Sequence, residues 1–307
     1  MRVAGQILRT LLLLWLATLA AFAVVRAMPA DPAVLTLLAF DRPATPEAVA
    51  ALRAQWGLDR PLALQYLAWL ADFVAGDWRV SFRTGTPIFG EFLHRLPVSL
   101  GVGLAGLALA LGLAAPLGGA AARRPGGIVD RVLDALTLGA QAVPAFWLAC
   151  LLIWLFAVEL RWITVLGDGG WQRYVLPVAV VALAGLGPLA AVYRAGLLDV
   201  GRSLYVTAAI AKGLTPDEAL MRHGRRYAAL GLAAALTAEA GWVVGGAAVV
   251  EVVFGLPGIS AFLVDSIAVR DYFVLQAYIV VAVAWMLCVS LSAQLARAWL
   301  DPRTDEA

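Results

Sequence analysis

The chain has 307 residues, of which 62% are hydrophobic and 14% are charged. Since a soluble domain carries roughly 25% charged residues, this composition excludes a soluble globular protein and predicts that lipid covers most of the surface. The formal net charge is only +2, and the two cysteines, Cys150 and Cys288, lie far apart in apolar stretches. Their spacing argues against a CxxC metal site and against a disulfide scaffold.

The apolar stretches predict about six transmembrane helices. A helix needs roughly 20 apolar residues to cross the hydrocarbon core. Five stretches contain no Asp, Glu, Lys or Arg: residues 10–25, 96–122, 135–158, 174–193 and 272–296. A sixth, residues 227–250, is interrupted only by Glu239. Because Arg2 and Arg9 precede the first stretch, a cleaved signal peptide is the alternative for that segment.

The basic residues predict how these helices are oriented. With six spans both termini lie on one side, and a cytoplasmic N-terminus leaves only Arg161, Arg173 and Arg270 in the two short outer loops. The inner segments then hold Arg2, Arg9, Arg123, Arg124, Arg131, Arg194, Arg202, Lys212, Arg222, Arg225, Arg226, Arg297 and Arg303. Short cytoplasmic loops carry an excess of Lys and Arg, so we expect both termini in the cytoplasm.

The first span is followed by the one long segment outside the membrane, and this segment contains helix signals. Thr45 before Pro46 is typical of an N-cap with proline at the first helical position, and Gly57 is placed to end that helix after about Trp56. We therefore expect a first transmembrane helix (1–28), a small periplasmic helical insertion (29–95) and a five-helix transmembrane core (96–307).

A second helix of the insertion is expected after Pro61. Its apolar residues repeat at helical spacing, which predicts an amphipathic face. The face is formed by Leu64, Tyr66, Leu67, Leu70 and Phe73. It either packs the small outer subdomain or binds a partner, and the sequence leaves both interpretations open.

Between the fourth and fifth spans lies a polar segment, residues 199–226, that is long for a connection between membrane helices. Thr215 and Pro216 predict the start of a helix, and Gly213 marks a break before it. The segment also holds five basic residues: Arg202, Lys212, Arg222, Arg225 and Arg226. We expect a cytoplasmic helix, a glycine and a second helix, to which another protein docks.

The sequence lacks the residues that catalysis or metal binding would need. The two histidines, His94 and His223, both lie outside the apolar spans, so neither an HExxH site nor an intramembrane Ser-His dyad can form. No GxxxxGK[ST] motif occurs, so any use of ATP requires a partner. We expect no catalytic residue, no metal ligands and no cofactor bound by this chain, which we do not expect to be an enzyme.

Some residues of the membrane stretches admit two interpretations. The pairs Gly118-Gly119 and Gly245-Gly246 are typical of close helix packing in lipid. Glu239 and Glu251 are expected at different depths of the fifth helix, with Glu251 at its outer end. Each carboxylate, like the glycines near them, either belongs to a transport pathway or is a structural group at a helix contact.

Several motifs in a fixed order give the chain a resemblance to a known family over nearly its whole length. They are Pro29-Ala30-Asp31-Pro32, Gly57-Leu58-Asp59-Arg60-Pro61-Leu62, Gln65-Tyr66, Gly76-Asp77, Ser81-Phe82, Arg95-Leu96-Pro97, Val143-Pro144-Ala145-Phe146-Trp147, Leu176-Pro177, Val250-Glu251, Val253-Phe254, Pro257-Gly258, Arg270-Asp271-Tyr272 and Leu300-Asp301-Pro302-Arg303. In this order they resemble the permease subunits of dipeptide, oligopeptide and nickel ABC importers.

The cytoplasmic segment holds the most specific part of the resemblance. It is similar to the EAA motif, which in that family forms a coupling helix seated in a groove of the ATPase subunit. The matching residues are Ala208, Ala209, Ala211, Lys212, Gly213, Leu214, Arg222 and His223. The chain departs from the family at Ile210, Tyr227 and Gly231, where Arg, Asn and Pro are usual.

The resemblance implies a multi-pass permease of the bacterial inner membrane. Its implied partners are a second homologous permease, two ATPase subunits that use the ATP, a periplasmic solute-binding protein and membrane lipid, but no nucleic acid. Residues 167–172 and the short chain are more similar to nickel-type members, which favours nickel or a metal chelate as the solute. A di- or oligopeptide is the alternative within the family.

A secondary transporter or channel is the alternative from another class. In such a protein Glu239 and Glu251 would be proton or ion sites. Many secondary transporters contain inverted repeats, and the first three spans show no convincing similarity to the last three.

Overall fold

The computed structural model describes residues 2–27, 31–165 and 170–300, with side chains placed at 4–27, 31–165 and 170–295. Three sequence motifs lie only partly within the described residues. The parts that fall outside are Pro29-Ala30 of the motif at 29–32, residues 167–169 of the segment 167–172, and Asp301-Pro302-Arg303 of the motif at 300–303. Within the described ranges every regular element is a helix, apart from one isolated antiparallel bridge between Val80 and Pro87. The predicted all-α class is therefore confirmed.

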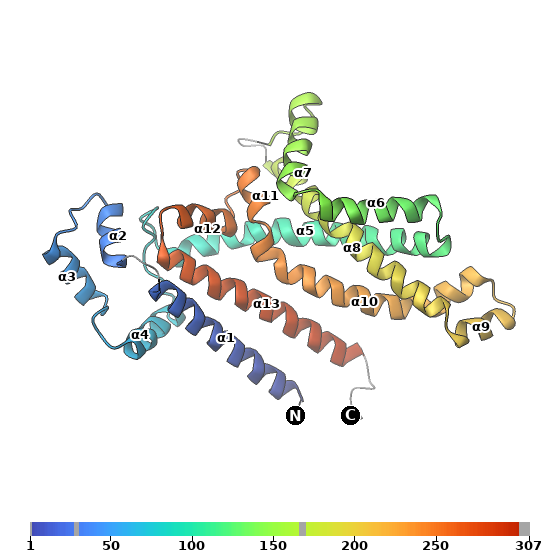
Figure 1. The fold of residues 1–307 in the computed structure, drawn as a ribbon, viewed down its shortest axis with the longest axis horizontal. Coiled ribbons are helices and arrows are strands. Elements are labelled where there is room, and N and C mark those ends of the chain that lie inside the picture. Colours follow the sequence, from blue (N-terminus) through green and yellow to red (C-terminus); the bar gives the residue numbers. More distant parts are fainter. Residues whose placement is uncertain (1, 28–30, 166–169, 301–307) are drawn as a thin grey trace. The chain divides into compact units, whose positions relative to one another are not determined.

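The chain forms two compact units, of which the first is Met1–Val98 with Pro257–Ala307. Its helices are α1 (Arg2–Arg26), α2 (Pro32–Ala39), α3 (Pro46–Gln55), α4 (Leu62–Val74), the first turns of α5 (Ile88–Arg123), α12 (Ile259–Ala268) and α13 (Tyr272–Leu300). In this unit α1 lies beside α13, on which α12 also packs (Figure 1). The two ends of the chain therefore build one unit together.

The second unit is Ser99–Leu256. It holds the rest of α5, α6 (Ile128–Ala142), α7 (Ala145–Leu152), a π-helix (Ile153–Glu159), a 3-10 helix (Gly170–Tyr174), α8 (Val175–Gly201), α9 (Leu204–Ala211), α10 (Pro216–Gly246) and α11 (Ala248–Val253). α8 is its central helix and packs against α6 and α10 (Figure 1). These two units are defined by packing. The predicted division into a first transmembrane helix (1–28), a periplasmic insertion (29–95) and a transmembrane core (96–307) concerns membrane topology and stays a prediction.

Five helices of the described chain are long and apolar enough to cross a membrane: α1, α5, α8, α10 and α13. The span predicted at residues 135–158 is not one straight helix, because the chain bends by 108° between α6 and the stretch from Ala145 to Glu159. The bend follows from Pro144, which has no N–H for a helical bond and drives the preceding residue out of the helical region. Val143 is indeed extended, at φ −93° and ψ 119°. By length and composition, the described residues therefore contain five candidate spans, or six if the bent pair is counted as one.

Glycine lets α5 and α8 approach closely. A Cβ atom on Gly118 would stand 2.4 Å from the carbonyl oxygen of Ala190, so only glycine fits there and the predicted close packing is confirmed at Gly118. A Cβ atom on Gly119 would meet Met221 at 3.7 Å, an ordinary contact that does not require glycine.

A Cβ on Gly245 would meet no atom within 4 Å, and one on Gly246 only Trp242 at 3.8 Å. Within the described chain, the close packing predicted at this second pair is therefore wrong. The close approach on this end of α10 lies at Val243 instead, which would stand 2.2 Å from a Cβ atom on Gly103 of α5.

The helical insertion matches the prediction in its local signals but not in its packing face. The Thr45 side chain caps α3 by accepting a hydrogen bond from the Ala48 amide at 3.3 Å, as predicted. On α4, however, Leu64 and Leu67 are exposed, whereas Gln65 and Tyr66 are buried. The Tyr66 ring packs edge-on to Phe22 of α1, with centroids 5.5 Å apart. This contact turns the predicted leucines outward.

Candidate coupling site and outer polar network

The short helix α9 is held against the rest of its unit by one buried face. Val206 and Ala209 are 2% and 8% exposed and pack with Val200 of α8 and Ala219 of α10. Small apolar side chains at this spacing allow the helix to lie close to its neighbours. The orientation of α9 is therefore set within the second unit.

The other face of α9 is open and apolar. Leu204 is 88% exposed, and Tyr205 and Ile210 are also exposed. Of the predicted coupling residues, Ala208, Ala211, Lys212, Gly213, Arg222 and His223 are exposed, Leu214 is half-buried and Ala209 is buried. Exposed apolar side chains next to basic residues are typical of a surface that binds a protein partner.

The turn after α9 depends on Gly213. Its φ is +98°, a conformation that side chains with a Cβ atom rarely adopt, and its amide donates to the Ile210 carbonyl at 2.9 Å. The next helix begins with a capping box, in which the Thr215 amide donates to Glu218 at 3.0 Å and the Glu218 amide donates to the Thr215 hydroxyl at 3.3 Å. Gly213 and this box define a fixed elbow, residues 211–218.

The elbow brings the two predicted halves of the coupling segment together. The His223 ring on α10 packs edge-on to the Tyr205 ring on α9, with centroids 6.1 Å apart. Arg222 lines a shallow pocket of about 440 Å³ with Leu214, Glu218, Met221 and Arg225. A force on α9 therefore reaches α10 through side-chain contacts as well as through the backbone.

The two acidic candidates lie away from the elbow and on different helices. Glu239 is half-buried on α10, but α10 ends at Gly246 and Glu251 lies on the separate helix α11. The prediction that both lie on one helix is wrong, because a glycine pair precedes the break and glycine favours helix ends over helix interiors. Glu251 is fully buried, and α11 packs on α7 and α8.

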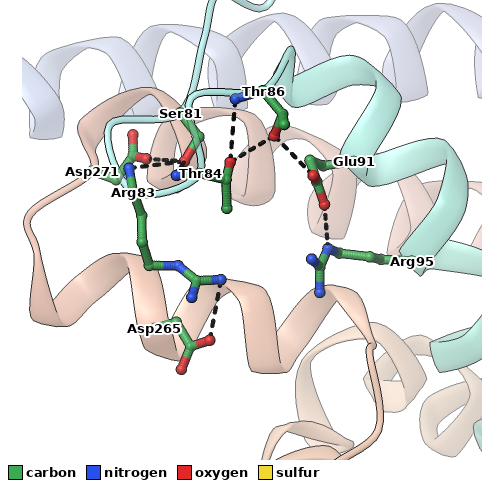
Figure 2. Close-up of polar contacts among 8 residues, drawn as sticks. All are labelled: Ser81, Arg83, Thr84, Thr86, Glu91, Arg95, Asp265 and Asp271. Atoms are coloured by element: carbon green, nitrogen blue, oxygen red, sulfur yellow. Dashed lines mark hydrogen bonds and ion pairs between the residues drawn. The ribbon is translucent and has the colours of Figure 1, made fainter. Parts of the chain in front are cut away.

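In the first unit the structure shows a polar network that the sequence did not reveal. The carboxylate of Asp271, just before α13, is fully buried and accepts a hydrogen bond from the Ser81 hydroxyl at 2.6 Å (Figure 2). It also accepts one from the Phe82 amide at 2.7 Å. Burial raises the pKa of the Asp271 carboxyl, although these donors favour its charged form. Because 190 residues separate Ser81 from Asp271, no local pattern predicts this bond.

The network continues along the same loop. The Arg83 guanidinium forms an ion pair with Asp265 of α12 at 3.2 Å (Figure 2). The Thr84 and Thr86 hydroxyls lie 2.6 Å apart, and Thr86 donates to Glu91 at 2.8 Å. Glu91 in turn accepts from Arg95 at 2.6 Å. These bonds tie the loop of residues 79–87 to three helices of its own unit.

Metal ions in proteins are held by groups of His, Cys, Asp and Glu side chains. Among the residues that the structure describes, no group of three or more His, Cys, Asp and Glu side chains is arranged to hold a metal ion. The described chain thus offers two features for a function: a surface for a partner at α9 and a polar network before α13.

Comparison with known proteins identifies the family. The family described as "Binding-protein-dependent transport system inner membrane component" matches residues 114–306, and the one described as "Binding-prot-dependent transport system membrane comp, N-term" matches residues 2–103. The glutathione transport system permease protein GsiC of Escherichia coli (strain K12) is 32% identical over 94% of each chain. The probable peptide ABC transporter permease protein y4tP of Sinorhizobium fredii is 29% identical over 92% of each chain.

These matches cover both ends of the chain and agree with its long apolar helices. They confirm a multi-pass protein of the bacterial inner membrane and a permease of an ABC importer, whose family works with ATPase and solute-binding partners. The names of these relatives refer to peptides and glutathione and do not support the predicted preference for nickel or a metal chelate. The chain belongs to the family of binding-protein-dependent transport system inner membrane components.

Proposed function

We propose that this permease forms the membrane path for di- or oligopeptides, including short peptides of the glutathione type. The support is the similarity over more than nine-tenths of the chain to permeases named for peptide and for glutathione transport. In this proposal the chain itself is not an enzyme, binds no cofactor, and leaves ATP hydrolysis to its partners.

We further propose that α9 and the elbow are the coupling site. The residues that contact the ATPase are then the exposed part of the set predicted from the sequence: Ala208, Ala211, Lys212, Gly213, Arg222 and His223. The exposed apolar side chains of α9 supply the area that a partner would bury. Leu214 and Ala209 do not face the partner; they pack on the buried side of α9 and hold this helix in place.

The proposed coupling follows from the stiffness of the elbow. When the ATPase moves α9, the capping box at Thr215 and the contact of Tyr205 with His223 make the start of α10 move with it. α10 is 31 residues long, enough to cross a bilayer, so such a movement reaches the opposite side. A second, homologous permease and two ATPase subunits would complete the assembly, and a solute-binding protein would deliver the peptide.

The solute is tested with the assembled transporter in proteoliposomes. The permease, its native partner subunits and the solute-binding protein are reconstituted, and ATP hydrolysis is measured with a dipeptide, with glutathione and with nickel. We expect stimulation by at least one of the peptides and none by nickel. Stimulation by nickel alone would overturn the proposed solute class.

A further inference from the structure

A basic pocket opens beside the elbow in the second unit, with a volume of about 1120 Å³. It lies where the end of α5, the end of α8, α9 and the start of α10 meet (Figure 1). Four arginines line it: Arg123, Arg124, Arg194 and Arg202. Asp217 is the one acidic residue among its lining residues, so the pocket carries an excess of positive charge.

Two of the four arginines are already paired. The Arg194 guanidinium binds the buried carboxylate of Asp130, with Nη2 and Oδ2 2.8 Å apart. Arg123 forms an ion pair with Asp217 at 3.3 Å. Within the described part of the chain, neither Arg124 nor Arg202 forms an ion pair, and both are exposed. These two guanidinium groups are therefore available to an anion.

The remaining walls of the pocket are apolar. They include Val129, Leu198, Val206, Ile210 and Leu220. A free inorganic anion gains nothing from such walls, whereas a phospholipid presents a phosphate and acyl chains together. Basic pockets between helices on the cytoplasmic side of a membrane are suited to anionic headgroups. The pocket lies at the ends of membrane-crossing helices, where lipid phosphates are found.

We propose that this basic pocket binds the phosphate of an anionic phospholipid of the cytoplasmic leaflet, with Arg124 and Arg202 as its direct contacts. Arg123 and Arg194 hold the walls in place through their own carboxylate partners. The bound lipid lies against Ile210 and Pro216, on the two sides of the elbow. It therefore braces α9 against α5 and α8. Ile210 keeps this wall of the pocket apolar.

The proposal is tested with the full chain in nanodiscs of phosphatidylcholine that contain increasing fractions of phosphatidylglycerol. Native mass spectrometry counts the phosphatidylglycerol molecules that stay bound to the protein after it is released from the nanodisc. The double variant R124Q/R202Q is expected to weaken retention by about 25-fold, because each of the two basic residues contributes about a factor of five in anionic-lipid binding. The variant R124K/R202K keeps both charges and is expected to retain binding, which also shows that the pocket tolerates substitution.

The control is R225Q/R226Q, which removes the same charge from exposed positions of the same cytoplasmic segment that do not line the basic pocket. An equal loss of lipid in this control would overturn the proposal, since attraction to the membrane surface would then explain the binding. Inorganic phosphate added to pure phosphatidylcholine nanodiscs is the second arm. In this arm the hydrogen exchange of α9 is measured with phosphate and, separately, with phosphatidylglycerol. If phosphate protected α9 as strongly as phosphatidylglycerol, the ligand would be a free anion and not a lipid.

A third measurement addresses the ATPase subunit. The lipid count is repeated on the transporter assembled with its ATPase subunits. We expect the same lipid to remain bound. Its loss on assembly would overturn the proposal and assign the pocket to the protein interface.

Discussion

The loop of residues 79–87 and the elbow at residues 211–218 are both short connections next to membrane helices, but they are built in opposite ways. In the loop, polar side chains satisfy one another, from Ser81 with Asp271 to Glu91 with Arg95. At the elbow, the backbone is capped, while one face of the adjoining α9 is uncovered and its Leu204 is 88% exposed. The polar groups of the loop are satisfied within its own unit, whereas the apolar side chains on the outer face of α9 are left uncovered in the described chain.

This difference shows what each region contributes to a transporter. A buried polar group costs about 1–3 kcal/mol when it loses its partner, so the bonds around Asp271 hold the loop in one position. An exposed leucine or tyrosine contributes only when another surface covers it. The loop therefore stabilises the fold, whereas α9 is free to bind.

The largest effect is expected from Gly213→Val, which would break the elbow. Valine is strained at φ +98°, because a β-branched side chain is an outlier at positive φ. We expect solute-stimulated ATP hydrolysis and uptake to fall to background, while the amount of permease in the membrane stays normal. Gly213→Asn is the matched control, since Asn tolerates positive φ better, and it should retain part of the activity. Normal uptake in the valine variant would contradict the proposed coupling site.

The next effect is expected from Asp271→Ala, which would break the loop. The Ser81 hydroxyl and the Phe82 amide would lose their acceptor, at a cost of about 2–5 kcal/mol for the two groups. Hydrogen exchange should show loss of protection in residues 79–87. Asp265→Ala is the control, because its ion pair with Arg83 is half-exposed and such pairs contribute about 1 kcal/mol or less. Equal effects of both variants would contradict a special role of Asp271.

A smaller effect is expected from Leu204→Asp on the outer face of α9. Covering a leucine contributes about 1.5–3 kcal/mol, so the affinity for the ATPase subunit should fall by about tenfold to a hundredfold. Titration of the ATPase subunit onto permease in nanodiscs measures this change. Leu64→Asp, on the equally apolar but separate surface of α4, is the control and should leave the affinity unchanged. If Leu64→Asp weakened binding of the ATPase subunit as much as Leu204→Asp does, α9 would not be the specific contact.

The smallest effect is a pH dependence of the loop. Burial raises the pKa of Asp271 above its ordinary value of 3.8, so the folded protein binds this proton more tightly than the unfolded chain does. The resulting stability is present at low pH and is lost as the pH rises from about 3.8 through the raised pKa. Protection of residues 79–87 should fall over this window in the wild type. Asp271→Asn should remove the change, and the same pH profile in both proteins would contradict the assignment.

The sequence by itself determined the features that depend on neighbouring residues. Freedom from charge over a long stretch predicts a membrane span, because lipid excludes charged groups. Thr45 and Thr215 predict helix starts, because an N-cap bonds to an amide two or three residues away. Gly213 predicts a turn, because glycine adopts positive φ without a steric cost. Asp31 before Pro32 is a further local signal of this kind, because its side chain caps α2.

Tertiary structure alone decided which of these features meet. Pro144 is visible in the sequence, but the angle of 108° between its helices is set by their neighbours. The outward turn of Leu64 depends on the contact of Tyr66 with Phe22, and Asp271 meets Ser81 across 190 residues. The basic pocket likewise draws its arginines from two helices. Such contacts depend on how helices pack, and packing joins residues whose separation along the chain contains no information about their distance in space.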